Sequence, residues 1–213
     1  MALKWKPIIW HISRALAKLP PFDLAQLYRG INCKIAGYEE GKFVLWEAFS
    51  STTANPDVIK DFTGSEGSVF IIRPKRSGQG HMINFLSEFE KEAEVLFDSN
   101  TWFRVNQLLG PGPKQLLAHH LHLQLDTTDV YELEEVDEWT VREEERKRIE
   151  QERRAHEAEQ LRLQDMTQRL LAAVEDGDAK ECLQCLEGGA NPNAIGTHGR
   201  AVPGPAVHRS LPY

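Results

Sequence analysis

Residues 85–97 read FLSEFEKEAEVLF, and this stretch places an acid at every second position before it ends in an apolar run. The acids are Glu88, Glu90, Glu92 and Glu94. Because alternate side chains of a strand lie on the same face, four carboxylates there would repel one another. The segment is therefore either a solvated loop that leads into a strand, or part of a site that needs carboxylates.

The composition is that of an ordinary globular protein with an acidic balance. The chain has 213 residues, a formal net charge of −7 and 41% hydrophobic residues, which is enough for one moderate domain with an appendage. The charge does not favour nucleic acid as a partner. No apolar run reaches the length of about 18 residues that a membrane span needs, so we expect no membrane partner.

The first 21 residues are basic and could be read as a transit peptide. The apolar residues fall at helical spacing instead, which predicts a helix that packs under the first strand. These residues are Ile8, Ile9, Ile12, Leu16 and Leu19.

The cysteines predict an intracellular, cytoplasmic protein without a disulfide framework, because Cys33, Cys182 and Cys185 are few and odd in number. Cys182 and Cys185 have the C-x-x-C spacing of a zinc site. A closed zinc site takes four ligands and no second pair follows, and the same spacing places two residues on one helix face. We therefore expect no metal.

Residues 1–131 hold most of the aromatic residues and the short apolar runs, which predicts an α+β domain. The runs expected as strands are 27–33, 42–53, 67–74, 93–99, 102–109 and 120–126 (HLHLQLD). We expect that removal of everything after residue 131 leaves the chemistry of this domain intact.

Residues 132–166 are nearly all charged, with pairs such as Glu150–Arg154 at i,i+4. Apolar positions are too few for a coiled-coil seam, so this segment is predicted to be a solvated helical spacer. Acids outnumber bases there, which argues against a nucleic-acid role.

Residues 167–194 (TQRLLAAVEDGDAKECLQCLEGGANPNA) resemble one ankyrin repeat. Leu170–Ala173 would lie on its first helix, Gly177–Asp178 in the turn, and Cys182–Leu186 on its second helix. About three repeats are needed to bury a common core, and the segment that follows departs from the repeat pattern. We expect residues 195–213 to be disordered.

Three polar stretches interrupt the predicted strands. Arg29 in LYRG is either an ion-pair partner or a phosphate clamp, since guanidinium is a bidentate donor, and Gly30 allows a ligand to approach the backbone. Ser51 in FSSTT is a weak signal by itself. Glu92 and Glu94 in EAEV would point to one face of a strand, roughly 6.6 Å apart, as a glycosidase-type carboxylate pair or as a solvated charge run.

The order and spacing of these stretches resemble the R-S-E class of mono-ADP-ribosyltransferases, and the arginine-specific branch in particular. The resemblance runs from about residue 8 to residue 105 and implies an ADP-ribosyltransferase-like β-sandwich with flanking helices. It implies that Phe62, eleven residues past Ser51, stacks on nicotinamide. It also implies that Ser87 and Phe89 lie in a turn that recognises the target, from which the acids lead into the catalytic strand.

The resemblance assigns a role to each motif residue. Arg29 would bind the pyrophosphate and ribose of NAD, and the Gly30 backbone would hold the nicotinamide amide. Ser51 would orient Glu94, which would stabilise the oxocarbenium ion as nicotinamide leaves. Glu92 would position and deprotonate the acceptor arginine, and a glutamate at this place favours arginine over other acceptors. NAD is then a substrate, and the partner is a protein with an exposed arginine.

The chemistry is consistent with these roles. Cleavage of the N-glycosidic bond makes a cationic sugar that a carboxylate stabilises. Guanidinium is protonated and needs a base such as Glu92 as it attacks, and no metal is required because nicotinamide leaves as a neutral molecule.

Two features depart from the family pattern. Only 27 residues precede Tyr28, so the N-terminal lobe is expected to be short or missing, and Thr53 replaces the commoner serine. The alternative function is therefore a weak or inactive transferase fold that acts as an interaction module with the ankyrin repeat.

Overall fold

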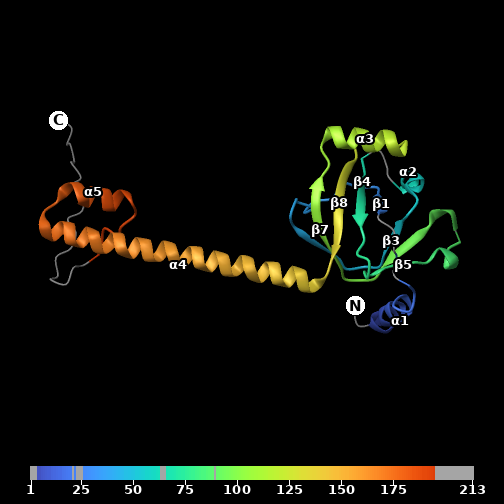
Figure 1. Ribbon diagram of the computed structural model, residues 1–213, viewed down its shortest axis with the longest axis horizontal. Helices are drawn as coiled ribbons and strands as arrows, with labels where there is room; N and C mark the ends of the chain where they lie inside the picture. Colours follow the sequence, from blue (N-terminus) through green and yellow to red (C-terminus); the bar gives the residue numbers. More distant parts are fainter. Residues whose placement is uncertain (1–3, 21, 23–25, 63–65, 89, 195–213) are drawn as a thin grey trace, which may run out of the picture. The chain divides into compact units, whose positions relative to one another are not determined.

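A computed structural model describes residues 4–20, 22, 26–62, 66–88 and 90–194, without the side chains of residues 61, 62 and 90. Strands and short helices alternate before two helices complete the described chain (Figure 1). The α-helices are α1 (Lys6–Leu16), α2 (Ile59–Phe62), α3 (Pro111–Leu121), α4 (Glu138–Asp176) and α5 (Ala179–Glu187). The strands are β1 (Leu27–Ile31), β2 (Phe43–Trp46), β3 (Ser50–Thr53), β4 (Ser68–Arg73), β5 (Gly80–Met82), β6 (Glu94–Phe97), β7 (Thr101–Leu108) and β8 (Asp129–Val136). Three 3-10 turns, η2 (Pro56–Val58), η3 (Asn84–Leu86) and η4 (Glu90–Glu92), separate some of them.

The eight strands form one mixed sheet in the order β2-β7-β8-β4-β1-β3-β6-β5. The β4–β8 pair is parallel and the other pairs are antiparallel. The expected α+β class is confirmed, since this sheet is accompanied by helices that precede, interrupt and follow its strands.

The join between β1 and β3 is the weakest in the sheet, because its register consists of the pair Tyr28↔Thr53. The sheet turns back on itself around this join. Phe97 of β6 packs edge-on against Phe103 of β7, with ring centroids 5.2 Å apart, although four strands separate β6 from β7 in the sheet. Two half-sheets therefore face each other across one core, as in a sandwich, and the backbone ladder joins them into a single sheet.

Strand β4 shows why both faces of the larger half-sheet are buried. Alternate side chains of a strand point to opposite faces, and here both sets are apolar. Phe70 and Ile72 belong to the core between the half-sheets, and Val69 and Ile71 belong to a second cluster that includes Ile59 of α2 and is covered by α3.

The N-terminal helix does not pack as its pattern predicts. In α1 Leu16 is buried and the Ser13 hydroxyl donates to Asp98 at 2.6 Å. Ile8 is 49% exposed, however, and Ile9 and Ile12 are also exposed. The apolar spacing predicted the helix correctly, but burial of its face was wrong because one turn alone meets the domain.

Two expected features of residues 110–137 are corrected. Residues 120–126 alternate polar residues with leucine like a strand, yet α3, which starts at Pro111, continues to Leu121 and is capped by His122 in the left-handed conformation. The boundary expected at residue 131 falls inside β8, which pairs with β4 up to Glu134 and with β7 up to Val136. Glu132, Glu134 and Glu135 gave this strand a charged appearance that concealed its alternating apolar residues.

The chain divides into two compact units, residues 1–143 and 144–213. In the second unit the last turns of α4 pack against α5 around Leu170, Cys185 and Ala190. The turn lies at Gly177 and Asp178, as expected, with Gly177 at φ +73° and Asp178 accepting hydrogen bonds from the first backbone amides of α5. Helix α4 is continuous across residue 166, so spacer and helix pair share one helix. Residues 195–213, expected to be disordered, lie outside the described residues.

None of the helices in the described part of the chain is long and apolar enough to cross a membrane.

Candidate active site

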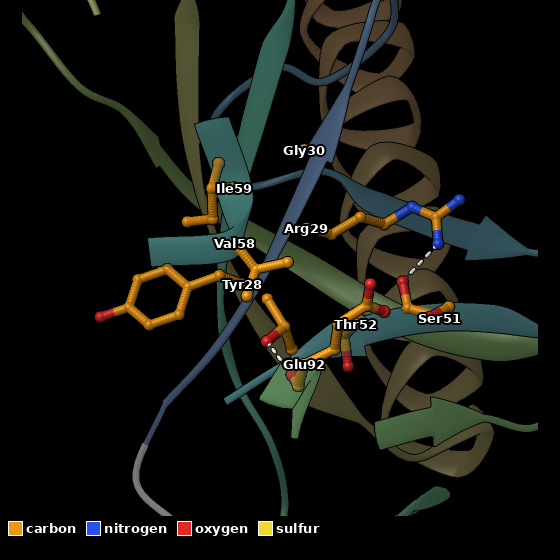
Figure 2. Close-up of a pocket in the computed structure, with 9 residues that line it drawn as sticks. Tyr28, Arg29, Gly30, Ser51, Thr52, Val58, Ile59 and Glu92 are labelled. Carbon is orange, nitrogen blue, oxygen red and sulfur yellow. Dashed lines mark hydrogen bonds between the residues drawn. The ribbon is translucent and has the colours of Figure 1, made fainter. Parts of the chain in front are cut away.

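A cavity of about 230 Å³ lies beside the β1–β3 join. Its lining residues are Tyr28, Arg29, Gly30, Ser51, Thr52, Thr53, Val58, Ile59 and Glu92. Figure 2 shows Arg29 and Ser51 reaching toward each other from neighbouring strands, with Val58 and Ile59 contributed by the turn and helix that follow β3. The fold thus brings together at one cavity the Arg29, Ser51 and Glu92 motifs, which lie far apart in the sequence.

Arg29 is half-buried and bridges the two strands. Its Nη1 donates to the backbone carbonyl of Ser51 at 2.5 Å, and its guanidinium carbon lies 5.4 Å from the ring centre of Trp46. Burial lowers the pKa of the Arg29 guanidinium from its usual value, and Tyr38 partly offsets this. Among the residues that the structure describes, no carboxylate forms an ion pair with Arg29. The cation is held by a carbonyl and an aromatic face, which suits binding of an anionic ligand.

Ser51 connects this cation to the first carboxylate. The Ser51 hydroxyl donates to Oε1 of Glu94 at 2.6 Å, and the next residue, Thr52, donates to the carbonyl of Val95 at 2.7 Å. Strand β3 pairs with β6 in the register Ser51↔Leu96 and Thr53↔Glu94. The two strands therefore place the serine diagonally across from the glutamate whose orientation it fixes.

Glu92 reaches the cavity by a different route from Glu94. Glu92 ends η4, Ala93 has φ +46°, and β6 begins only at Glu94. The expectation that the two acids share one strand face is wrong, because the left-handed turn at Ala93 interrupts the strand period. Glu92 lines the cavity, and Glu94 is held by Ser51.

The remaining predicted residues divide into those that the structure places and those that it does not. Gly30 lines the cavity. Ser87 follows η3 and its amide donates to the carbonyls of Ile83 and Asn84. Phe62 ends α2, but its side chain lies outside the described residues, and so does all of Phe89.

Sequence reasoning missed several residues that shape the cavity. Tyr28 precedes the predicted arginine, and burial raises the pKa of its phenol. Val58 and Ile59 follow Asn55 and Pro56, to which the sequence analysis assigned no part in the site. A signal existed, since Asn before Pro is a typical N-cap of a helical turn. The Asn55 side chain indeed accepts from the amide of Asp57 at 3.1 Å.

The site combines a half-buried cation and the carboxylate of Glu92 at one cavity, and a further carboxylate, that of Glu94, accepts a hydrogen bond from Ser51, which lines this cavity. Within the described part of the chain, no group of three or more His, Cys, Asp or Glu residues is arranged to hold a metal ion. The arrangement can bind an anion at Arg29 and stabilise a positive charge at Glu94.

A family model covers the part of the chain that holds this set of side chains. The family model described as "NAD:arginine ADP-ribosyltransferase" matches residues 2–123, more than half of the chain. The chain belongs to the NAD:arginine ADP-ribosyltransferase family.

Individual relatives agree with this family. The chain is 32% identical over 125 residues to Vis of Vibrio splendidus, assigned as an NAD(+)–arginine ADP-ribosyltransferase, with 54% of this chain and 47% of Vis covered. It is 33% identical over 115 residues to the NAD(+)–protein-arginine ADP-ribosyltransferase Tre1 of Serratia proteamaculans, with 52% and 24% covered. The chain thus spans about half the length of Vis and a quarter of Tre1.

A solved structure supports the fold. The catalytic domain of VahC from Aeromonas hydrophila superposes with a TM-score of 0.51 at 21% identity, covering 62% of this chain and 70% of that one. At this identity the likeness concerns the fold.

Proposed function

We propose that this chain transfers ADP-ribose from NAD to arginine side chains of proteins and releases nicotinamide. The observation that carries the proposal is the chain of contacts from Arg29 to the Ser51 carbonyl and from the Ser51 hydroxyl to Glu94. It supplies a cation for the phosphates of NAD and an oriented carboxylate for the sugar. The names of Vis and Tre1, both arginine ADP-ribosyltransferases, support the choice of arginine as acceptor.

In the proposed reaction the bond between the ribose C1′ and the nicotinamide nitrogen breaks, and its electron pair leaves with nicotinamide. Glu94, held by Ser51, stabilises the cationic sugar as this charge develops. A guanidinium nitrogen of the acceptor then bonds to C1′, and Glu92 accepts the proton that this nitrogen loses. Arg29 holds the pyrophosphate and ribose, and the Gly30 backbone receives the nicotinamide amide.

The size of the cavity indicates which part of NAD it takes. Its volume of about 230 Å³ is below the roughly 300–1,000 Å³ of sites that enclose a drug-sized ligand. It therefore suits the nicotinamide end of NAD, with the remainder outside. Phe62, Ser87 and Phe89 are proposed to serve nicotinamide stacking and target recognition.

The rest of the chain is proposed to support this reaction without taking part in it. We assign catalysis to residues 1–137, since β8 ends at Val136. Ion pairs such as Arg154–Glu150 at 2.8 Å line α4 as in a solvated spacer. The α4–α5 pair is proposed to be a single ankyrin-like unit. The three free cysteines accord with action in the cytoplasm.

The test of this function is a paired assay with NAD and agmatine, a small guanidinium compound. Mass spectrometry should show ADP-ribosyl agmatine together with released nicotinamide. Arg29→Lys should raise the KM for NAD at least about 10-fold, because lysine cannot make the bidentate contacts of arginine. Arg73→Lys is the matched control, since Arg73 is exposed at the end of β4 and pairs with Glu132. Absence of both products with the unmodified chain would overturn the proposal.

A further inference from the structure

The end of β3 holds the backbone that leads to Glu92 through three consecutive contacts. The Asn55 side-chain amide donates to the carbonyl of Lys91 at 3.1 Å. The Thr53 hydroxyl donates to the carbonyl of Glu92, and the amide of Ala54 donates to the carbonyl of Ala93 at 3.2 Å. Three successive carbonyl groups before β6 are thus fixed by three successive residues, the last of β3 and the two that follow it.

The side chain of Asn55 contacts two separate turns, η2 and η4. Its Oδ1 accepts from the amide of Asp57 and so caps η2, the turn that brings Val58 to the cavity. Its Nδ2 donates to Lys91 in η4, the turn that brings Glu92 to the same cavity. One side-chain amide therefore ties together two walls of the cavity.

The backbone conformation of Ala93, between Glu92 and Glu94, explains why these hydrogen bonds are needed. Ala93 has φ +46°, a conformation that a residue with a Cβ adopts when its surroundings hold it there. This turn lets Glu92 leave the face of β6 and line the cavity, whereas Glu94 is oriented by Ser51 through its own side chain. The two acids thus depend on different contacts from the same strand.

We infer that Asn55 is a positioning residue for Glu92 and controls the acceptor half of the reaction separately from NAD cleavage. The inference rests on the proposed function. A shift of Glu92 misplaces the base that serves the guanidinium, and a misplacement of about 1 Å can cost on the order of 10²-fold in rate. Water is less dependent on a positioned base once the sugar cation has formed, so hydrolysis of NAD should depend little on Asn55.

Two substitutions remove the hydrogen bond that the Asn55 side chain donates to Lys91 and keep an oxygen that can cap η2. Asn55→Asp keeps the oxygen that caps η2 but replaces the donor to Lys91 with a second oxygen. Asn55→Ser retains a good N-cap residue without charge and is too short to reach Lys91. Asn106→Asp is the matched control, because Asn106 lies on β7, separated from β3 by β8, β4 and β1.

The assay measures agmatine modification and nicotinamide release on the same samples. We expect both Asn55 variants to lose at least about 10-fold in transfer, with hydrolysis and the KM for NAD within about threefold of the unmodified chain. Asn106→Asp should leave both activities unchanged. Equal loss of transfer and hydrolysis, or no loss of transfer, would overturn the inference.

Hydrogen exchange distinguishes failure of this inference from failure of the proposed function. If the unmodified chain shows neither activity, the proposed function is wrong. The contacts that Asn55 makes with residues 91–93 are then judged by hydrogen exchange alone. Asn55→Asp should then speed exchange in a peptide over residues 90–97 and leave residues 101–108 unchanged. Unchanged exchange in both peptides would show that Asn55 does not hold this segment.

Discussion

At the scale of single residues, the site distinguishes two carboxylates by what holds them. Glu94 receives the Ser51 hydroxyl on its carboxylate, whereas Glu92 is held through the carbonyl of its backbone by Thr53. Glu94 is oriented through its carboxylate, whereas Glu92 is placed through its backbone. They are therefore expected to serve different steps.

Glu94→Gln should abolish both ADP-ribose transfer and NAD hydrolysis, because the sugar cation loses the charge that stabilises it. Glu92→Gln should abolish transfer to arginine and leave hydrolysis largely in place. Each lost activity should fall at least about 10²-fold, the scale of a removed general base or charge-stabilising group. The measurement is nicotinamide release against agmatine labelling on both variants. Identical effects of the two changes on both activities would contradict the assignment.

Glu135 is a charged residue with a structural place, 6% exposed on β8. Its two carboxylate oxygens accept from the amides of Lys75 at 2.8 Å and Gln79 at 2.6 Å. Burial raises its pKa above the usual value of 4.5, and these amides only partly offset the shift. The folded state therefore holds the proton more tightly than the unfolded state does, so the Glu135 contribution to stability declines as pH rises from about 4.5 through the folded pKa.

Glu135→Gln should remove this decline, because glutamine does not titrate. The difference in unfolding free energy between the two proteins, from urea melts at pH 4 to 8, should shift in favour of the variant as pH rises. At low pH the variant should be less stable by roughly 1–3 kcal/mol, since its amide accepts from only one of the two N–H groups. Glu134→Gln, at an exposed position of the same strand, should show neither effect. A pH-independent difference would contradict the assignment of a raised pKa.

At the scale of elements, the loop between β4 and β5 is folded around that carboxylate. A Cβ on Gly78 would overlap the carboxylate of Glu135, which cannot move without losing both backbone donors. Gly78→Ala should therefore lower the unfolding free energy by about 1–3 kcal/mol. Gly112→Ala is the matched control, because a Cβ there meets nothing within 4 Å. Chemical denaturation of both variants checks this, and equal stability would show that the loop yields.

The elements that sequence reasoning predicted correctly are those whose burial follows local apolar runs, such as the Val-Phe-Ile-Ile run of β4. Strand β8 was not predicted because its outward residues are acids. One inward residue, Glu135, is also an acid, and its partners are backbone amides of a distant loop. Motif spacing predicted Arg29, Gly30, Ser51 and Glu92, which line the cavity. The Asn55 contacts were not predicted, because a side chain that reaches a carbonyl 36 residues away leaves no local pattern.

At the scale of the whole molecule, the contacts divide at residue 143. A chain ending at Glu143 should keep cooperative unfolding and NAD cleavage within about threefold of the full chain, since every proposed site residue precedes it. A chain ending at Tyr131 should fail to fold, because it lacks Leu133, fully buried in the core between the half-sheets, and Glu135. Circular dichroism and nicotinamide release test both, and a folded but inactive 143-residue chain would mean that the second unit contributes to the site.

The single-pair join between β1 and β3 gives the sheet an interior edge. An edge strand offers backbone groups that another chain can pair with, and here the arginine of β1 spans the opening to the Ser51 carbonyl. The carboxamide of nicotinamide has the donor and acceptor of a peptide group, so at Gly30 it can complete the interrupted ladder as a short extra strand would. On the proposed function, bound NAD fills this gap in the ladder. NAD should then raise the melting temperature, because it links the two half-sheets at the place where their own backbone leaves them least connected.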